Sequence, residues 1–265
     1  MVANTELLRV RSNGWLTGLG NLLGKENRAW WGTRRWLVQG VLWTVVVNGF
    51  AAGMVLLMSA QAPQSLGMDL AAFALQLVFQ IGLLALGIGA IVLVQDAIIS
   101  ERQLGVTEWL LSKPVSRPAY FLSKLLANGL GVLVMLVGLQ GALGYGLVSL
   151  VGGQPFAVSS YLVGIAGLAV HTLFYLALTL LLGVLTCDRM KLLGISLGSL
   201  LGGMLITRFM GVFGLLTPWS LGDTLPYAVM GTVLPVPIWA TIGVTAVLAV
   251  TFVAVAIFKF QRLEF

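Results

Sequence analysis

Six runs of apolar residues, each long enough to cross a lipid bilayer, limit what this chain of 265 residues can fold into. The hydrocarbon core of a bilayer takes roughly 20 helical residues to cross. Backbone groups left unpaired in hydrocarbon are costly, so runs of this length predict transmembrane helices. The runs lie near 36–59, 70–95, 118–151, 160–186, 191–215 and 238–258. The sequence therefore predicts an all-α polytopic membrane protein with six transmembrane helices.

The charge content supports this class. Only 9% of the residues are charged, against roughly 25% in a soluble domain, which excludes an ordinary soluble protein. The length suits one domain over 1–265, with a cytoplasmic interfacial segment at 1–35, a six-span bundle at 36–258 and a tail at 259–265. No secretory signal peptide is evident.

The placement of the basic residues predicts the orientation. All of the 15 Lys and Arg residues except Arg208 fall on one side of the predicted spans. They are Arg9, Arg11, Lys25, Arg28, Arg34, Arg35, Arg102, Lys113, Arg117, Lys124, Arg189, Lys191, Lys259 and Arg262. The positive-inside rule makes that side cytoplasmic, with both termini inside a cell membrane, inner or plasma. Because the rule explains the net charge of +6, we expect lipids and no nucleic acid as partners.

The N-terminal segment predicts a helix on the membrane surface. Residues 1–13 are polar, and we expect them to be loosely ordered. Between Gly14 and Trp31, apolar residues recur at helical spacing. This predicts an amphipathic helix in the cytoplasmic interface, with Trp30 and Trp31 as anchors at headgroup level. A disordered basic tail is the alternative.

A polar stretch from Gln95 to Ala127 interrupts the apolar sequence between the second and third spans. Charges are costly in hydrocarbon, so this stretch belongs at a membrane surface or in a partner protein. We expect the second span to continue as a helix to Gly105. We expect Ser116 to cap the third span, with Pro118 in its first turn.

Between those two helices the sequence predicts a short helix, about Thr107 to Lys113. Thr107 can cap it and Pro114 ends it. Its side chains are of mixed polarity and comprise Glu108, Trp109, Leu110, Leu111 and Lys113. A short helix with such a face suits a groove in a partner protein.

Small residues recur every four positions in two spans. Gly194, Gly198 and Gly202 lie in the fifth span, and Gly138, Ala142 and Gly146 lie in the third. Such ridges let helices approach closely. They indicate packing within the subunit or a contact between two copies. The Pro-rich segment 217–237 predicts a short interfacial or re-entrant element that closes the outer end of the bundle.

An intramembrane serine hydrolase is a remote alternative. Ser196 lies in a G-x-S-x-G pattern, and His171 is the only histidine. A Ser–His pair needs hydrogen-bond contact. Ser196 is expected roughly 8 Å from the cytoplasmic end of its span and His171 roughly 22 Å from the end of its own. We therefore expect no catalytic pair, and His171 to be a satisfied residue of the bundle.

Other sites find little support. Gly18 to Lys25 resembles a phosphate loop only faintly, because its spacing is wrong and Glu26 replaces Ser or Thr. One His and one Cys do not indicate a metal site. Arg208, near the outer end of the fifth span, is expected either to extend to outer lipid headgroups or to line a substrate path. We expect no catalytic, cofactor or metal site on this chain.

The polar stretch resembles the cytoplasmic loop of ABC transporter permeases of the ABC-2 type, and is closest to the NosY-like branch. The matching positions are Asp96, Ala97, Glu101, Gly105, Thr107, Glu108, Leu110, Leu111, Ser112, Pro114, Val115, Ser116, Arg117 and Lys124. Val106 separates Gly105 and Thr107, which are adjacent in that pattern. The segments Lys25-Glu26-x-Arg28 and Phe258-x-x-x-Arg262 also resemble the start and the end of such permeases, so the resemblance covers nearly the whole chain.

The resemblance implies a permease subunit, of an exporter, that pairs with a second permease copy, identical or related. It also implies two copies of a separate cytoplasmic ATPase, which would hold ATP and Mg. The short helix would be the coupling helix seated in that ATPase, and substrate would cross between the permease copies. The residues implied in coupling are Glu101, Arg102, Thr107, Glu108, Trp109, Leu110, Leu111, Lys113 and Arg117. A membrane scaffold or assembly factor that binds a cytoplasmic partner is the alternative.

Overall fold

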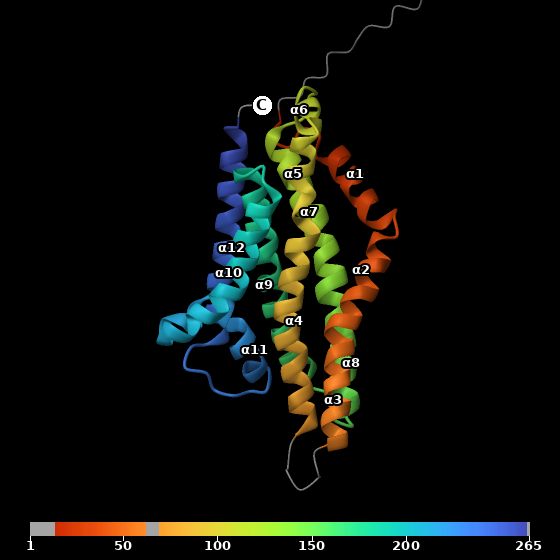
Figure 1. Cartoon of the computed structure of the whole chain (residues 1–265), viewed down its shortest axis with the longest axis vertical. Coiled ribbons are helices and arrows are strands. Elements are labelled where there is room, and N and C mark those ends of the chain that lie inside the picture. The colour runs from red at the N-terminus through yellow and green to blue at the C-terminus, as the bar shows by residue number, and fades with distance from the viewer. Residues whose placement is uncertain (1–13, 62–68, 264–265) are drawn as a thin grey trace, which may run out of the picture.

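The computed structural model describes residues 14–61 and 69–263. Those residues form a bundle of helices, and they contain no strand (Figure 1). Six helical segments are long and apolar enough to cross a membrane: Arg35–Ala60, Leu70–Gln103, Arg117–Val151, Val158–Leu185, Arg189–Phe209 and Ile238–Gln261. The predicted class and number of spans are confirmed. The loose order expected for residues 1–13 concerns residues outside the described ranges.

Helix α9 (Val158–Leu185) forms the centre of the bundle, where it packs on α4 (Leu70–Val94) and α12 (Ile238–Gln261). Glycine allows the closest of these approaches. A Cβ atom at Gly164 of α9 would lie 2.2 Å from the Phe79 ring of α4. Most residues of α9 are consequently buried, whereas few residues of α12 are.

The first and third spans are each interrupted by a π-helical segment. The first consists of α2 (Arg35–Trp43), η1 (Thr44–Gly49) and α3 (Phe50–Gln61). The third consists of α7 (Arg117–Val132), η3 (Leu133–Gly138) and α8 (Leu139–Val151). Such segments leave backbone groups without their regular helical partners.

Two buried amides join these interrupted spans. Asn48 Nδ2 donates to Gln140 Oε1 at 2.9 Å. Gln140 Nε2 in turn donates to the carbonyl of Met135 at 3.2 Å, within η3. In hydrocarbon such groups have no water to bind, so the amides stabilise each other and the irregular backbone.

One end of the bundle carries the basic residues of the described chain, with the exception of Arg208. Figure 1 places α1 (Leu19–Trp31), α6 (Val106–Leu111) and the C-terminal end of α12 together there. We call it the basic end and the opposite end the far end.

Helix α1 packs along α7. Its Trp30 is 1% exposed, and its Nε1 donates to Asn128 Oδ1 at 3.0 Å. The prediction that Trp30 anchors the chain at headgroup level is therefore wrong, because its ring lies inside the protein against Gly131. Trp31 is partly buried against the core, and the helix begins at Leu19 rather than at Gly14.

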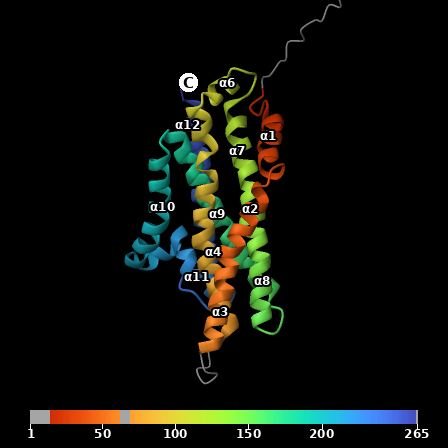
Figure 2. The same cartoon turned by 45° about the vertical axis from the view of Figure 1, so that its right-hand side comes forward.

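Helix α10 (Arg189–Ile206) stands at the edge of the bundle in Figure 2, and it packs on α4 and α9 through its buried Leu192 and Leu200. The fifth span ends near Phe209 rather than at 215, because the chain turns at Gly211, whose φ is 55°. Short 3₁₀ segments follow: η4 (Thr207–Phe209), η5 (Gly211–Leu216) and η6 (Pro218–Ser220).

The glycine ridge of α10 does not pack within the subunit. A Cβ atom at Gly194, Gly198 or Gly202 would meet no atom within 4 Å among the described residues. The same holds for Gly146 of α8. The interpretation of these ridges as internal packing is wrong for these positions, and the contact between two copies stays a prediction.

The Pro-rich segment after the fifth span packs into the bundle. Its helix α11 (Leu221–Val229) buries Leu221, Leu225 and Val229, and lies against α4 and α9. One face of the helix is thus covered by protein, whereas Tyr227 on it is 42% exposed. This packing agrees with an element that closes one end of the bundle, and the choice between an interfacial and a re-entrant position stays a prediction.

Candidate functional site at the basic end

The polar stretch forms two short helices between the second and third spans. Helix α5 (Asp96–Gln103) continues the line of α4. Gly105 then adopts a φ of 69°, a left-handed conformation that glycine enters without steric cost. Gly105 thus ends α5 as predicted, and α6 follows it directly.

The capping predictions have two outcomes. Ser116 caps α7 as predicted, since its Oγ accepts from the backbone of Ala119 at 3.2 Å, and Pro118 lies in the first turn. Thr107 does not cap α6, because the residue at the cap is Gly105 and no side chain bonds there. The hydroxyl of Thr107 instead faces the protein interior.

One face of α6 is exposed at the basic end. We call this the α6 face, and it consists of Leu104, Glu108, Trp109, Ser112 and Lys113. Trp109 is 60% exposed and Leu104 is 78% exposed. The Lys113 ammonium lies 3.9 Å from the centroid of the Trp109 ring, a cation–π contact. Leu110 and Leu111 pack partly against the core and fix the helix from below.

A chain of hydrogen bonds runs from α6 into the protein. Thr107 Oγ1 lies 3.3 Å from the hydroxyl of Tyr120 on α7. That hydroxyl donates to Glu101 Oε2 at 2.7 Å. The Phe260 ring of α12 stacks on Tyr120 with the ring centroids 5.3 Å apart. Residues of four helices, α5, α6, α7 and α12, therefore meet beneath the α6 face.

Glu101 is also the centre of an ion network, made of Lys25, Glu26, Glu101 and Lys124. Glu101 Oε1 lies 2.8 Å from Lys124 Nζ and 2.8 Å from Lys25 Nζ. Glu26 Oε1 lies 2.8 Å from Lys124 Nζ. The Lys124 side chain is only 5% exposed, and a buried charge needs such partners to be tolerated. The network joins α1, α5 and α7.

The environment of Lys25 favours its charged form. Burial acts to lower the pKa of Lys25, but the hydrogen bond and the charge of Glu101, together with Glu26, outweigh it and raise this pKa. Lys25 therefore carries its full charge at neutral pH. Two ammonium groups thus face two carboxylates in this network, in equal number.

Arginines attach α5 to the helices on its other side. Arg102 Nη1 donates to the carbonyls of Gly183 and Val184, at 3.2 and 2.9 Å, in the last turn of α9. These carbonyls belong to the helix end, where a cation is favourable. Nη2 of Arg189, the first residue of α10, lies 3.4 Å from Oδ2 of Asp96.

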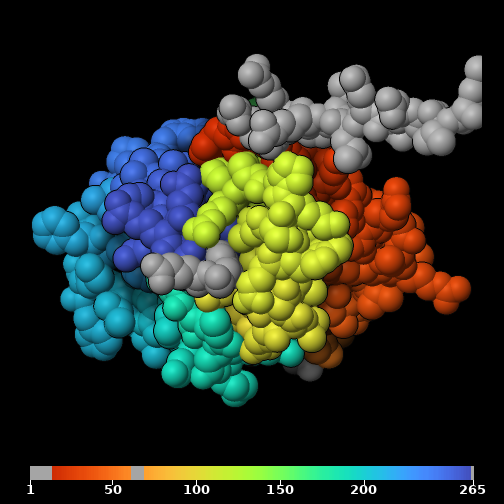
Figure 3. Space-filling model, turned by 90° about the horizontal axis from the view of Figure 1, so that it is seen from above, coloured from red at the N-terminus to blue at the C-terminus, as the bar shows by residue number. Residues whose placement is uncertain are grey.

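Arg117 attaches α7 to the end of α12. Its Nη1 donates to the carbonyls of Gln261 and Leu263, at 2.6 and 2.7 Å. The neighbouring Ser116 binds the segment that leads into α1. Its backbone N–H donates to the carbonyl of Thr17 at 3.0 Å. Figure 3 shows the α5–α6 segment at the centre of this end, between α1 and α12. The structure thus joins Thr107 to Glu101 through Tyr120, whereas Arg102 and Arg117 attach α5 and α7 to α9 and α12.

The Ser–His pair of a hydrolase is not formed. His171 Nδ1 lies 3.3 Å from the carbonyl of Pro218, to which it can donate a hydrogen bond. Neither Nε2 nor Ser196 Oγ has a hydrogen-bond partner within residues 14–61 and 69–263. His171 is thus a bundle residue with one satisfied nitrogen.

Two other predicted positions are located by the structure. Arg208 is exposed at the end of α10, beside Phe209. Gly18 precedes α1 in a left-handed conformation with φ of 84°, against Val115. The close contact with Val115 therefore explains why this position is a glycine. In the described part of the chain, no group of three His, Cys, Asp or Glu residues could hold a metal ion.

Neither the ion network nor the role of Tyr120 was predicted from the sequence. A signal was present in Lys124, which stands among apolar residues in the run L-S-K-L-L-A of a span. A lysine so placed requires a carboxylate partner. The pairing with Glu26, which is 98 residues distant, had no local signal.

Comparison with known proteins gives one match. A family model described as ABC-2 family transporter protein matches residues 21–265, which include the α6 face and the whole ion network. No curated protein matches the chain. The match does not distinguish the NosY-like branch.

Proposed function

We propose, because the chain belongs to the ABC-2 family of transporter proteins, that it is the permease subunit of a transporter driven by a separate ATPase. The family is a component of membrane transport, and the six apolar helices make this chain a multi-pass membrane protein. In the proposal the protein lies in the inner or plasma membrane of a cell, and its basic end faces the cytoplasm. ATP and Mg are bound by the ATPase, and the transporter exports its substrate.

The α6 face carries this proposal. It combines an exposed indole with an exposed carboxylate and ammonium, Glu108 and Lys113, on and just after a helix at the tip of the basic end (Figure 1). Aromatic side chains surrounded by polar groups are typical of protein interfaces. A cleft of the ATPase would receive Trp109 and pair with these charges.

The contacts behind α6 indicate how movement of the ATPase would be transmitted. Thr107 and Tyr120 join α6 to Glu101, and Glu101 joins α5 to α1 and α7. Arg102 continues this connection to α9. A displacement of α6 is therefore shared among several spans at once, because few of these buried polar contacts can break without leaving a charge unpaired.

Two further parts of the proposal concern the membrane. A second permease copy, identical or related, would contact the outward glycine ridge of α10, where an added Cβ atom would meet nothing within 4 Å in the part of the chain that the structure describes. Substrate would cross between the two copies, along faces of the first, second and fifth spans. Arg208, exposed at the end of α10, would lie at the outer part of this path.

Co-purification tests the proposal. The affinity-tagged chain would be isolated from its native membrane in mild detergent, and the bound proteins identified by mass spectrometry. We expect an ATPase in near-equal amount, lost in Trp109→Ala and in Glu108→Lys. Trp239→Ala is the matched control, because Trp239 is 59% exposed but begins α12 at the far end.

The outcomes separate the candidate functions. An ATPase that is retained in both α6 variants would contradict the assignment of the α6 face. Capture of a different cytoplasmic protein at the same face, without an ATPase, would identify the chain as a scaffold or assembly factor. ATP turnover of the partner, measured with and without the chain, should rise with the wild type and not with Trp109→Ala.

A further inference from the structure

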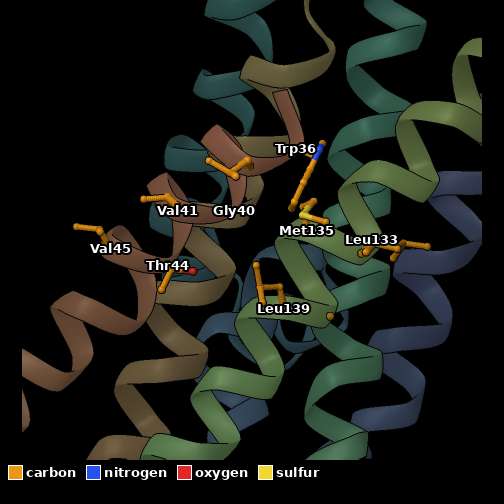
Figure 4. Close-up of a pocket in the computed structure, with 11 residues that line it drawn as sticks. Trp36, Gly40, Val41, Thr44, Val45, Leu133, Met135 and Leu139 are labelled. Atoms are coloured by element: carbon orange, nitrogen blue, oxygen red, sulfur yellow. The ribbon is translucent and has the colours of Figure 1, made fainter. Parts of the chain in front are cut away.

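An apolar groove opens on the outer surface of the bundle between the first and third spans (Figure 4). Its volume is about 770 Å³. One wall comes from α2 and η1, and the other from η3 and the first residue of α8. The lining is Trp36, Leu37, Gly40, Val41, Thr44, Val45, Leu133, Val134, Met135, Gly138 and Leu139.

The groove lies within the membrane-spanning part of the chain and is open to its surroundings. Val41 is 59% exposed and Val45 is 64% exposed. Gly40 and Gly138 remove side-chain volume from its walls, and the π-helical turns η1 and η3 both border it. An unbranched hydrocarbon chain matches a long apolar groove of this kind, since burial of apolar surface is its driving force.

A basic rim adjoins one end of the groove. Arg34 precedes α2 and is exposed, and it lies two residues before Trp36, or roughly 3 Å along the helix axis. Arg28, in the last turn of α1, is exposed as well, and it lines a neighbouring hollow together with Thr33, the residue before Arg34. Arg35, by contrast, is occupied, because it donates to the carbonyl of Leu93 at 2.9 Å and covers the Trp30 ring.

Trp36 marks the junction between the groove and this rim. In Figure 4 its indole nitrogen lies at the end of the groove opposite Val45. An indole placed between an apolar surface and a polar one can donate its N–H to a lipid ester or phosphate.

We propose that this groove binds an acyl chain of an anionic phospholipid, whose phosphate contacts Arg34 and Arg28. A second copy of the chain suits the groove less well. Two copies in one membrane share their orientation, so a two-fold axis that passed through the groove would bring Arg34 close to its own equivalent. An anionic lipid satisfies both the apolar wall and the basic rim. The site is independent of the ATPase and of the α6 face.

Native mass spectrometry of the full chain tests this site. The purified protein would be titrated with phosphatidylglycerol and, separately, with phosphatidylcholine of the same acyl chains. We expect preferential retention of phosphatidylglycerol by the wild type. Arg34→Gln should weaken retention about fivefold, as for one cation lost at a membrane surface, and Arg28→Gln should add to this effect. Val41→Trp, which fills the groove, should abolish preferential retention.

Two matched variants control for general effects. Lys191→Gln removes an exposed basic residue at the start of α10, and Val247→Trp enlarges an exposed apolar residue of α12. Both should retain phosphatidylglycerol as the wild type does. Equal retention of the two lipids by the wild type, or equal losses in test and control variants, would overturn the site. The site would also be overturned if the wild type formed a dimer that dissociates only in the Val41→Trp variant, because the groove would then be a subunit contact.

Discussion

Lys124 Nζ and Glu101 Oε1 lie 2.8 Å apart, although their residues belong to the two spans on either side of α6. The contact holds together the two ends of the segment that contains α6. A helix of six residues is not stable alone. Its position is therefore determined by the polar groups of α5 and α7 beneath it.

Removal of Lys124 should destabilise the protein strongly. In Lys124→Met, Glu101 and Glu26 lose a shared partner in a largely buried site, and we expect a loss of about 3–5 kcal/mol. Thermal unfolding in detergent measures it. Lys25→Met is the control and should cost less, because the Lys25 side chain is half exposed. Equal losses in the two variants would contradict the burial argument.

Substitutions at Thr107 and Tyr120 distinguish a loss of protein stability from a loss of coupling between α6 and the spans. Thr107→Val removes one hydroxyl contact, so we expect a loss of about 1 kcal/mol and unchanged binding of the ATPase. Tyr120→Phe also removes the bond to Glu101 and should cost more. In both variants we expect lower stimulation of the partner's ATP turnover. Wild-type stimulation in Tyr120→Phe would exclude this path.

The contact of α1 with α7 can be tested at a pair of glycines. Gly131→Ala would place a Cβ atom 2.6 Å from the Trp30 ring, so we expect a loss of about 1–3 kcal/mol. At Gly129, a Cβ atom meets nothing within 4 Å, so Gly129→Ala should be neutral or stabilising by about 0.5–1 kcal/mol. Thermal unfolding of both variants is the measurement. A stable Gly131→Ala variant would show that α1 is not held there.

The glycine ridge of α10 should affect association and not folding. We expect Gly198→Leu to unfold at the wild-type temperature but to bind a second, differently tagged copy about tenfold more weakly. Gly243→Leu on α12 is the control, since Gly243 is equally open. Unchanged self-association in Gly198→Leu would assign the ridge to lipid instead.

The number of spans and several helix boundaries were predictable because their signals are local. Apolar length predicts the spans, and the residues Gly105, Ser116 and Pro118 end or begin helices through their own backbone and side-chain preferences. The family resemblance rested on the same stretch, and the match to residues 21–265 confirms it.

The wrong predictions concern residues whose partners are distant in the sequence. Thr107 has the composition of a cap, but its hydroxyl faces Tyr120 once α7 packs beneath α6. Trp30 has the position of an interfacial anchor, but Gly131 of α7 provides a site for its ring. Local pattern cannot show which helix will cover a residue, so burial at such positions depends on the tertiary fold.

The pairing of Asn48 with Gln140 has a consequence for the order of assembly. The two residues are 92 positions apart, in the first and third spans. During synthesis the first span enters the membrane before its partner exists, with an amide that hydrocarbon cannot satisfy. The first span is therefore expected to remain beside the translocation channel, or beside water, until the third span arrives.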